Sequence, residues 1–403
     1  MTDNRTFLVV GAGQAGGWCA RTLRSEGFEG RVVLIGDEAY APYERPPLSK
    51  QALTGEAAVE SAYLWPPDSW DGMGVELRLG WRVESIAPDE HTATISGGKT
   101  IAWDRLMIAT GSRPRMLEVP GADLAGIHTI RTIPDIEAIR AQVAPGRTAV
   151  VVGGGWIGLE AAAAFRKLGM EVVVVEAADR LCSRAATPAT SDYLLKLHRD
   201  NGVDVRLNCV VGRFDGDGAL ERVLLGDDSV VDAAIAVVGI GIVPNVELAE
   251  SAGIETANGI RVDAFCRTSA PDIFACGEVT SQPVWGRLES WENAQNQGIA
   301  GAKSMLDAGE AYGEAPWFWS DQYDVNLQIV GIARDWEEEA TRGSAANGAF
   351  ITFYLTGGKI VGAVAVNNGR DLRFARRLMQ AGATVTAEEL ADPAVKLQAL
   401  LKR

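Results

Sequence analysis

The sequence is poor in the residues from which metal centres and disulfide frameworks are built. Its 403 residues include three histidines and five cysteines, and no two cysteines form a CxxC pair. The cysteines stand at positions 19, 182, 209, 266 and 276, so none occurs from Ala20 to Leu181. This spacing supports neither a disulfide framework nor a zinc or iron–sulfur site, and we expect no metal.

Long apolar runs and excess positive charge are also missing. No run approaches the roughly 20 apolar residues that a membrane helix needs, and residues 1–5 lack the pattern of a secretory signal, so we expect a cytoplasmic protein. The net charge of −15 argues against nucleic acid and anionic membranes as partners. A chain of this length with 47% hydrophobic residues is expected to form two or three domains.

Glycine, by contrast, is abundant, and one glycine pattern occurs twice. The apolar run 7–10 leads into Gly11-Ala12-Gly13-Gln14-Ala15-Gly16, and the run 149–152 leads into Gly153-Gly154-Gly155-Trp156-Ile157-Gly158. Each copy reads as strand, tight turn and helix. Each is followed by a second β-branched run that ends at an acid, which is Asp37 or Glu38 in the first copy and Glu176 in the second.

This pattern is typical of dinucleotide binding. The first glycine allows the turn, the second lets backbone N–H groups approach a pyrophosphate, the third lets helix and strand pack closely, and the acid accepts from ribose hydroxyls. A single GxGxxG is weak evidence, but two copies in the same strand–helix context meet the structural test for the motif. Because a carboxylate repels a 2′-phosphate, Glu176 predicts a preference for NADH over NADPH.

The segments around the two copies predict further elements. Alternating runs from Val75 to Ile108, including 75–79 and 92–95, suggest a small antiparallel sheet, with Gly97-Gly98 between strands. Residues 326–330, 349–355 and 360–366 read as strands, and two helical segments follow. Prolines in 41–50 exclude a helix until Leu48 and predict that one begins near Ser49. Glu278 follows a short strand and is expected at a helix start.

Several side chains allow a structural or a functional interpretation. Lys50 could stabilise an anionic reduced flavin or be an ordinary solvated lysine. Glu160 could be favoured by the helix dipole alone, or could face a nicotinamide among close-packed alanines. The aromatic run 317–319 could cover a cofactor, although core packing is the commoner role.

Taken together, these motifs resemble one family. Two dinucleotide folds in tandem are similar to the two-dinucleotide-binding-domain flavoproteins. Within that group the chain resembles the NADH:ferredoxin reductases that feed bacterial ring-hydroxylating oxygenases and some cytochromes P450. The motifs that carry the resemblance are Pro46-Pro47-Leu48-Ser49-Lys50, Ala109-Thr110-Gly111, the fingerprint from Gly153 to Glu160, Glu289-Ser290-Trp291 and Pro316-Trp317-Phe318-Trp319-Ser320-Asp321-Gln322.

The resemblance implies an α/β fold like that of glutathione reductase, with two Rossmann-like domains, the second inserted in the first, and a C-terminal α+β domain. The implied domains are an FAD-binding domain at 1–112 and 247–318, an NADH-binding domain at 113–246, and a flavin-covering domain at 319–403. FAD contacts are implied at Gly11, Gly13, Ala15, Gly16, Asp37, Lys50, Val83, Arg131, Glu278, Trp291 and Trp319. NADH contacts are implied at Gly153, Gly155, Ile157, Gly158, Glu160, Glu176, Arg184 and Gly241.

Two positions depart from the family pattern. Glu278 stands where the family usually has Asp, so its contact with FAD is open to displacement. Trp156 fills a position that is commonly smaller, which bears on how the nicotinamide approaches.

The activity implied is a redox relay in which NADH reduces FAD, and FAD passes electrons singly to a [2Fe–2S] ferredoxin. Lys50 and Glu160 are the expected catalytic ion pair. Rubredoxin is an alternative acceptor, and a flavoprotein that senses NADH by changing partners is an alternative function. A disulfide reductase is disfavoured because such enzymes place redox cysteines between the first fingerprint and the lysine region, where this chain has none from Ala20 to Leu181. Cys19, near the first helix, is expected to be a buried small hydrophobe. Arg370, Arg373, Arg376 and Arg377 could dock an acidic ferredoxin or form a solvated helix face.

Overall fold

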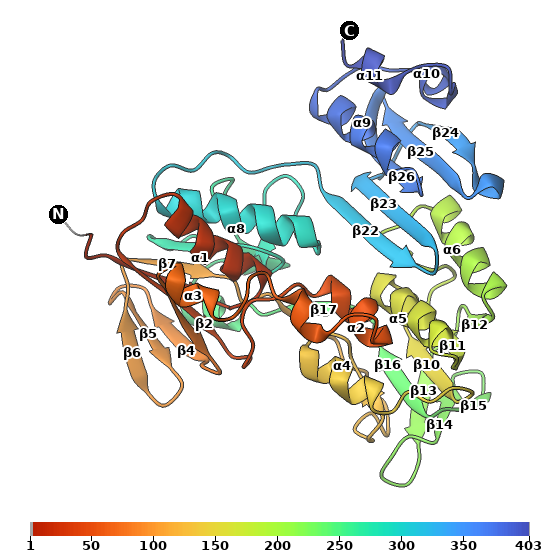
Figure 1. Cartoon of the computed structure of the whole chain (residues 1–403), viewed down its shortest axis with the longest axis horizontal. Coiled ribbons are helices and arrows are strands. Elements are labelled where there is room, and N and C mark those ends of the chain that lie inside the picture. Colours follow the sequence, from red (N-terminus) through yellow and green to blue (C-terminus); the bar gives the residue numbers. More distant parts are fainter. Residues whose placement is uncertain (1–2, 403) are drawn as a thin grey trace. The chain divides into compact units, whose positions relative to one another are not determined.

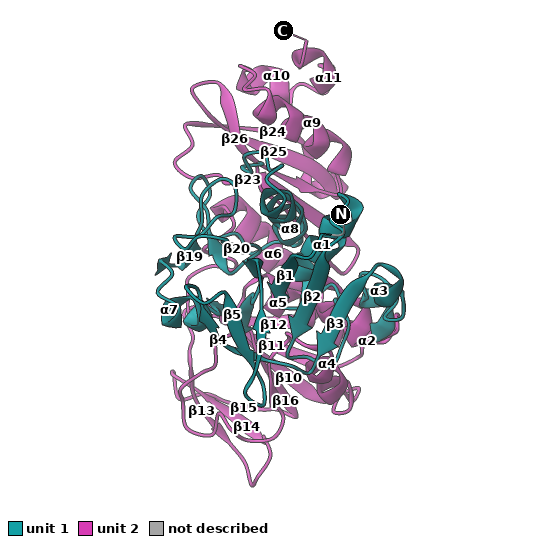
Figure 2. Cartoon of the chain, turned by 90° about the vertical axis from the view of Figure 1, so that its left-hand side faces the viewer, with its two compact units in different colours: residues 1–45, 59–113, 242–314 teal, residues 46–58, 114–241, 315–403 magenta. Residues whose placement is uncertain are grey.

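The computed structural model describes residues 3–402 and divides them into two compact units (Figures 1 and 2). Of the described residues, the first unit comprises 3–45, 59–113 and 242–314, and the second comprises 46–58, 114–241 and 315–402. The predicted boundaries of three domains remain a prediction. The two units differ from them in joining the segment 46–58 and the C-terminal residues from 315 onward to residues 114–241.

The first unit is built on a parallel five-stranded sheet in the order β20-β7-β1-β2-β3. Four of its strands are buried on both faces, as is typical of parallel sheets between two layers, and the edge strand β3 is only partly buried. The strands are β1 (Thr6–Val10), β2 (Arg31–Gly36), β3 (Val75–Leu79), β7 (Arg105–Ile108) and β20 (Ile273–Ala275). Helices α1 (Gln14–Ser25) and α8 (Trp291–Met305) lie side by side over one face (Figure 1), and a Cβ on Gly298 would lie 2.5 Å from the Ala15 carbonyl oxygen, so glycine permits this close packing.

A three-stranded antiparallel sheet packs on the opposite face. Its strands are β4 (Val83–Ala87), β5 (Thr92–Ile95) and β6 (Lys99–Ala102), and Gly97-Gly98 form the predicted turn. The assignment of 75–79 to this antiparallel sheet is wrong, because β3 pairs in parallel with β2. The remaining elements of the unit are η2 (Val59–Ala62), α3 (Ser69–Gly72), β17 (Ile242–Pro244), α7 (Glu247–Ser251), β18 (Thr256–Ala257), β19 (Gly259–Arg261) and β21 (Thr280–Ser281).

The second unit repeats the order of four strands. Its parallel sheet has the order β12-β11-β10-β16-β9, in which β12-β11-β10-β16 matches β3-β2-β1-β7, whereas β9 precedes β10 in the chain and β20 follows β7. The strands are β9 (Ile127–His128), β10 (Thr148–Val152), β11 (Glu171–Val175), β12 (Val203–Arg206) and β16 (Ile235–Val238). The helices are α4 (Ile133–Arg140), α5 (Trp156–Lys167) and α6 (Pro188–Asp200), and an antiparallel sheet consists of β13 (Val211–Asp215), β14 (Arg222–Leu225) and β15 (Val230–Asp232). The repeated order confirms the prediction of two Rossmann-like folds. The chain enters this unit through β8 (Ser112–Pro114).

The C-terminal part of the second unit is an antiparallel sheet of order β22-β23-β26-β25-β24 with helices beside it. Its elements are β22 (Trp317–Gln322), β23 (Val325–Gly331), β24 (Glu338–Ser344), η3 (Ala345–Asn347), β25 (Ala349–Thr356), β26 (Lys359–Val366), α9 (Gly369–Gln380), α10 (Ala387–Ala391) and α11 (Leu397–Leu400). The three predicted strands are confirmed. The sequence missed β24, and the chain ends in three helical segments where two were expected.

Two local predictions need correction. The proline segment does form helical structure before Leu48, because η1 spans Pro46–Ser49 and α2 spans Gln51–Thr54. Glu278 is not at a helix start: β21 follows it, and α8 begins only at Trp291. None of the helices in residues 3–402 is long and apolar enough to cross a membrane.

Candidate functional site

In the first glycine turn, the outer two glycines are closely packed and the middle one faces open space. Gly11 has φ +111°, and a Cβ there would lie 2.2 Å from the Ala109 carbonyl oxygen. A Cβ on Gly16 would lie 1.9 Å from the Gly11 carbonyl oxygen, so this glycine lets α1 pack against the turn. A Cβ on Gly13, however, would meet nothing within 4 Å. The middle glycine therefore leaves an open approach to the backbone, as a bound pyrophosphate requires.

The N-terminus of α1 is suited to an anion. Gly13 is its N-cap, no side chain caps it, and its first turn holds no acid. Its backbone N–H groups thus lack side-chain acceptors and carry the positive end of the helix dipole. These features fit the diphosphate of FAD.

Two other predicted FAD residues lie beside this helix start. The Gln14 side-chain amide donates to the Trp291 carbonyl oxygen at 2.9 Å. A Cβ on Gly277 would lie 2.9 Å from the Ala15 Cβ, which places the adjoining Glu278 near α1. The Glu278 carboxylate accepts from the Ser112 hydroxyl at 2.8 Å.

The acid after β2 is displaced relative to the second copy. Strand register aligns Gly36 with Glu176, because Val10 pairs with Ile35 as Val152 pairs with Val175. A Cβ on Gly36 would lie 2.5 Å from the Ala12 Cβ, so no carboxylate fits there. The predicted Asp37 comes one residue later and is exposed.

The neighbouring Glu38 already has partners. Its carboxylate accepts from the Tyr43 hydroxyl at 2.5 Å and from the Arg45 guanidinium at 2.8 Å. Asp37 is therefore the acid of this pair with no such partner among residues 3–402.

The remaining predicted FAD residues are distributed between the units. Val83 begins β4 and is buried in the core of the first unit. Lys50, Arg131 and Trp319 belong to the second unit. The Arg131 backbone N–H donates to Asp135 at 2.9 Å, directly before α4.

The second glycine turn reproduces the first. Gly153 has φ +105°, a Cβ on Gly158 would lie 2.2 Å from the Gly153 carbonyl oxygen, and the nearest atom to a Cβ on Gly155 would be 4.0 Å away. Helix α5 likewise has no side-chain cap and no acid in its first turn. Ile157 in that turn is 44% exposed. These features fit a second dinucleotide.

Three predicted NADH residues, Glu176, Arg184 and Gly241, have partners in this unit. The Glu176 carboxylate accepts from the Gly154 N–H at 2.6 Å and from the Ala178 N–H at 2.7 Å, which orients it beside the glycines. A Cβ on Gly241 would lie 3.0 Å from an Arg184 guanidinium nitrogen, so these residues are neighbours. Trp156 packs against Phe318 with ring centroids 5.1 Å apart.

A buried ion pair joins the two predicted catalytic residues. The Lys50 ammonium lies 2.9 Å from Glu160 Oε2, with side-chain exposures of 9% and 5%. The Ser49 hydroxyl donates to Oε2 and the Ser320 hydroxyl donates to Oε1 at 2.6 Å. Both carboxylate oxygens are therefore held, and a charge inside the protein is compensated by a cation and two hydroxyl donors.

This burial excludes the two structural interpretations that the sequence left open for Lys50 and Glu160. Lys50 is not a solvated lysine, and Glu160 is not an exposed acid at a helix end. Sequence reasoning missed the two serines, although both lie in motifs that carried the resemblance.

The aromatic run is partly buried. The Trp317 and Trp319 rings stack at 5.1 Å, and the Lys50 ammonium lies 5.9 Å from the Trp319 ring centroid. Trp319 thus contacts the ion pair, a position that core packing alone does not require.

The five cysteines are buried and offer no reactive thiolate. Burial raises the pKa of Cys19, Cys182, Cys209 and Cys276 above the usual thiol range, and raises the pKa of Cys266 to about 12. A low pKa and access are both needed for thiol redox chemistry.

Three of the four predicted docking arginines share one exposed face. Arg370, Arg373 and Arg377 on α9 are exposed, whereas Arg376 is half-buried and donates to the Ala315 carbonyl oxygen at 3.4 Å. No ion pair involves the three exposed arginines within residues 3–402. Arg376 therefore does not belong to the exposed group.

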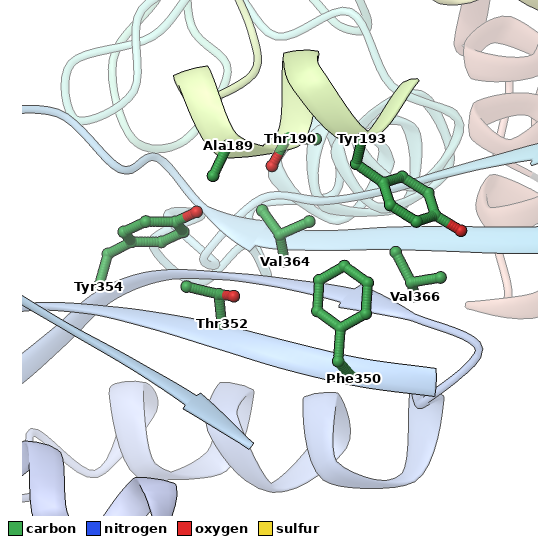
Figure 3. Close-up of a pocket in the computed structure, with 8 residues that line it drawn as sticks. All are labelled: Ala189, Thr190, Tyr193, Phe350, Thr352, Tyr354, Val364 and Val366. Carbon is green, nitrogen blue, oxygen red and sulfur yellow. The ribbon is translucent and has the colours of Figure 1, made fainter. Parts of the chain in front are cut away.

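A small cavity lies away from these residues. It measures about 30 Å³ and lies between α6 and the C-terminal sheet (Figure 3). Its volume suits one water molecule and no cofactor.

Comparison with known proteins assigns the family. Residues 5–298 match the pyridine nucleotide-disulphide oxidoreductase model, and residues 317–401 match the reductase C-terminal model. The chain therefore belongs to the pyridine nucleotide-disulphide oxidoreductase family. The fold predicted from the motifs is confirmed.

Full-length relatives narrow the group. The chain is 43% identical to the ferredoxin–NAD(+) reductase component of the anthranilate 1,2-dioxygenase system of Burkholderia cepacia, covering 98% of this chain and 99% of that one. It matches putidaredoxin reductase, solved in a covalent complex with putidaredoxin, with a TM-score of 0.96 and 35% identity over 99% and 98% of the two chains. It also matches a ferredoxin reductase of Rhodopseudomonas palustris with a TM-score of 0.95 and 36% identity, covering 98% of this chain and 99% of that one. The resemblance to the NADH:ferredoxin reductases is confirmed.

Proposed function

We propose that this protein is an FAD-dependent ferredoxin–NAD⁺ reductase that supplies electrons to an oxygenase system. The observation that carries the proposal is the presence of two open glycine cradles in a chain whose five thiols are all buried. Two dinucleotides can bind, and no thiol relay can follow, so electrons pass directly to an external carrier. The full-length relatives named as ferredoxin reductases support the same conclusion.

The two cradles have different roles in this proposal. FAD binds at Gly11, Gly13 and Gly16, with Glu278 and Trp291 beside the helix start, and NADH binds at Gly153, Gly155 and Gly158. Bound FAD supplies the ability to accept two electrons from NADH and to release them one at a time. The chain contributes orientation and electrostatics.

Lys50 and Glu160 act as the catalytic pair. Lys50 provides a fixed positive charge beside Trp319, and Glu160 is held by hydroxyls on both oxygens. A carboxylate held in this way can orient a polar group of the nicotinamide, since it needs no reorganisation during the reaction.

The proposed partner is an acidic [2Fe–2S] ferredoxin that docks on Arg370, Arg373 and Arg377. At positions i, i+3 and i+7 of α9 these side chains point in one direction. A basic face on a protein of net charge −15 can select and steer an acidic carrier.

The test is an anaerobic titration of the purified flavoprotein with NADH, followed by turnover with added carriers. We expect NADH to bleach the flavin spectrum, and NADH oxidation to rise steeply with a [2Fe–2S] ferredoxin. Rubredoxin as the better acceptor would indicate a rubredoxin reductase. Slow turnover that no carrier accelerates would favour the NADH-sensing alternative and contradict the proposal.

A further inference from the structure

A line of hydrogen bonds leads from Glu160 away from Lys50 and into α6. The Ser320 hydroxyl, which donates to Glu160, accepts from the Gln322 side-chain amide at 3.0 Å. The Gln322 carbonyl oxygen lies 2.8 Å from His198 Nε2. Ser320, Gln322 and His198 are at most 2% exposed, and all belong to the second unit.

The carboxylate fixes the direction of every bond in this line. Ionised Glu160 can only accept, so Ser320 donates to it and its oxygen accepts from the Gln322 NH₂ group. The Gln322 carbonyl oxygen then faces His198, whose Nε2 must carry the proton. His198 Nδ1 lies 3.1 Å from the Tyr323 hydroxyl and accepts from it. Burial lowers the pKa of His198 to about 4, which agrees with the neutral ring that this pattern requires.

The sequence places these groups together through strand alternation. Ser320 and Gln322 are two residues apart on β22, so their side chains share one face, whereas Trp319 and Asp321 point to the other face. His198 occupies the last turn of α6. Trp319 thus lies near Lys50 on one face of β22, while Ser320 and Gln322 on the other face connect Glu160 to His198.

We propose that Gln322 and His198 are positioning residues that hold Glu160 in its reactive orientation through Ser320. This inference rests on the proposed function, which assigns Glu160 to the nicotinamide site. Neither residue contacts Glu160 or Lys50 directly. Without Gln322, the Ser320 hydroxyl is free to rotate away from Oε1, and one oxygen of the carboxylate loses its fixed donor.

Another buried hydrogen bond in the same region provides a matched control, which tests whether the network has only a structural role. The Thr187 hydroxyl lies 2.8 Å from the Tyr354 hydroxyl and also joins α6 to the C-terminal sheet. This bond is buried but leads to no residue of the site. Tyr354, drawn in Figure 3, can therefore be changed to Phe to remove an equivalent link without touching the line to Glu160.

The first experiment measures the His198 tautomer in the FAD-loaded protein by ring ¹⁵N NMR. With three histidines in the chain, the His198→Gln variant assigns the signals. We expect an Nε2–H ring from pH 5.5 to 8 in the wild type. Glu160→Gln and Ser320→Ala should shift the ring resonances, because Gln322 loses its fixed orientation, whereas Tyr354→Phe should not. Resonances that move in neither variant would overturn the proposal.

The second experiment measures flavin reduction by NADH in single turnover. Gln322→Met should lower the limiting rate about tenfold while the NADH dissociation constant changes little, since the loss concerns orientation more than binding. His198→Gln keeps an N–H donor and should remain closer to wild type than His198→Met. A limiting rate for both Met variants equal to that of Tyr354→Phe would refute the positioning role.

The two arms separate this inference from the proposed function. If NADH fails to reduce the wild-type flavin, the proposed function fails, while the NMR arm still decides whether Glu160 controls His198. If wild-type reduction is normal and the variants match the control, the positioning role alone fails.

Discussion

Glu176 accepts a hydrogen bond from the Gly154 backbone N–H at 2.6 Å, which fixes its carboxylate at the second glycine turn. At this position a carboxylate favours a ribose 2′-hydroxyl and repels a 2′-phosphate. We predict that wild-type kcat/KM is higher with NADH than with NADPH. Glu176→Gln should lower the ratio of kcat/KM for NADH to kcat/KM for NADPH about tenfold. Asp37→Asn, in the first copy, should leave the ratio unchanged. A wild-type preference for NADPH would contradict the assignment.

The ion pair between Lys50 and Glu160 predicts a strong effect on stability. Lys50→Met leaves a buried carboxylate without its cation, and we expect a loss of about 3–5 kcal/mol in the free energy of unfolding. Combining it with Glu160→Gln should recover much of this loss, as a double-mutant cycle in chemical denaturation would show. Additive effects of the two substitutions would argue against the pair.

His198 predicts a pH dependence of stability. Its pKa is lowered from 6.5 to about 4 in the folded protein, so the unfolded chain binds more protons between these values. Stability should be complete above pH 6.5 and fall as the pH drops toward 4, with this residue contributing roughly 3 kcal/mol. His198→Gln should flatten the curve of unfolding free energy against pH over this interval. Parallel curves for the two proteins would contradict the neutral buried ring.

The face formed by Arg370, Arg373 and Arg377 predicts a salt-dependent effect on ferredoxin reduction. Arg373→Glu should raise KM for ferredoxin several-fold at low ionic strength, with the difference shrinking as salt is added. Lys196→Glu on α6 makes the same change in net charge at an exposed position and serves as the control. Equal KM values for the two variants would place the docking surface elsewhere.

The open space at Gly13 predicts a loss of FAD affinity without a loss of fold. Gly13→Ala adds a methyl group that meets no protein atom within 4 Å but projects from the turn where the pyrophosphate approaches. We expect weaker FAD retention on gel filtration and an unchanged melting temperature of the FAD-free protein. Gly16→Ala should lower that melting temperature, because its Cβ would collide with the Gly11 carbonyl oxygen.

The parts of the structure that the sequence predicted are those with strong local patterns. Both strand–glycine–helix copies and the strands β23, β25 and β26 carry continuous apolar or alternating runs. Strand β24 was missed because Glu338–Ser344 is mostly polar and exposed, and its pairing with β25 supplies what its own residues do not indicate. Strand β3 alternates like its neighbours, and only long-range parallel pairing with β2 decides its sheet.

The candidate site divides in the same way. Glycines and acids of the fingerprints can be identified from spacing, whereas Lys50 and Glu160 are 110 residues apart and required the family resemblance. His198 was missed because an isolated histidine in an amphipathic helix has no sequence signal, and its partner Gln322 comes from another element. Hydrogen bonds across such distances depend on tertiary packing that no local pattern encodes.

At each glycine turn, a residue of the turn faces a residue at the end of the second strand, and the larger of the two side chains is on opposite partners in the two copies. In the first copy Ala12 faces Gly36, and in the second Gly154 faces Glu176. Gly36→Glu alone would collide with Ala12, and Gly154→Ala alone would collide with Leu181, because a Cβ there would lie 2.4 Å from a Leu181 methyl carbon. Interchange of the residues at the two turns therefore requires paired changes, since each single substitution meets a collision.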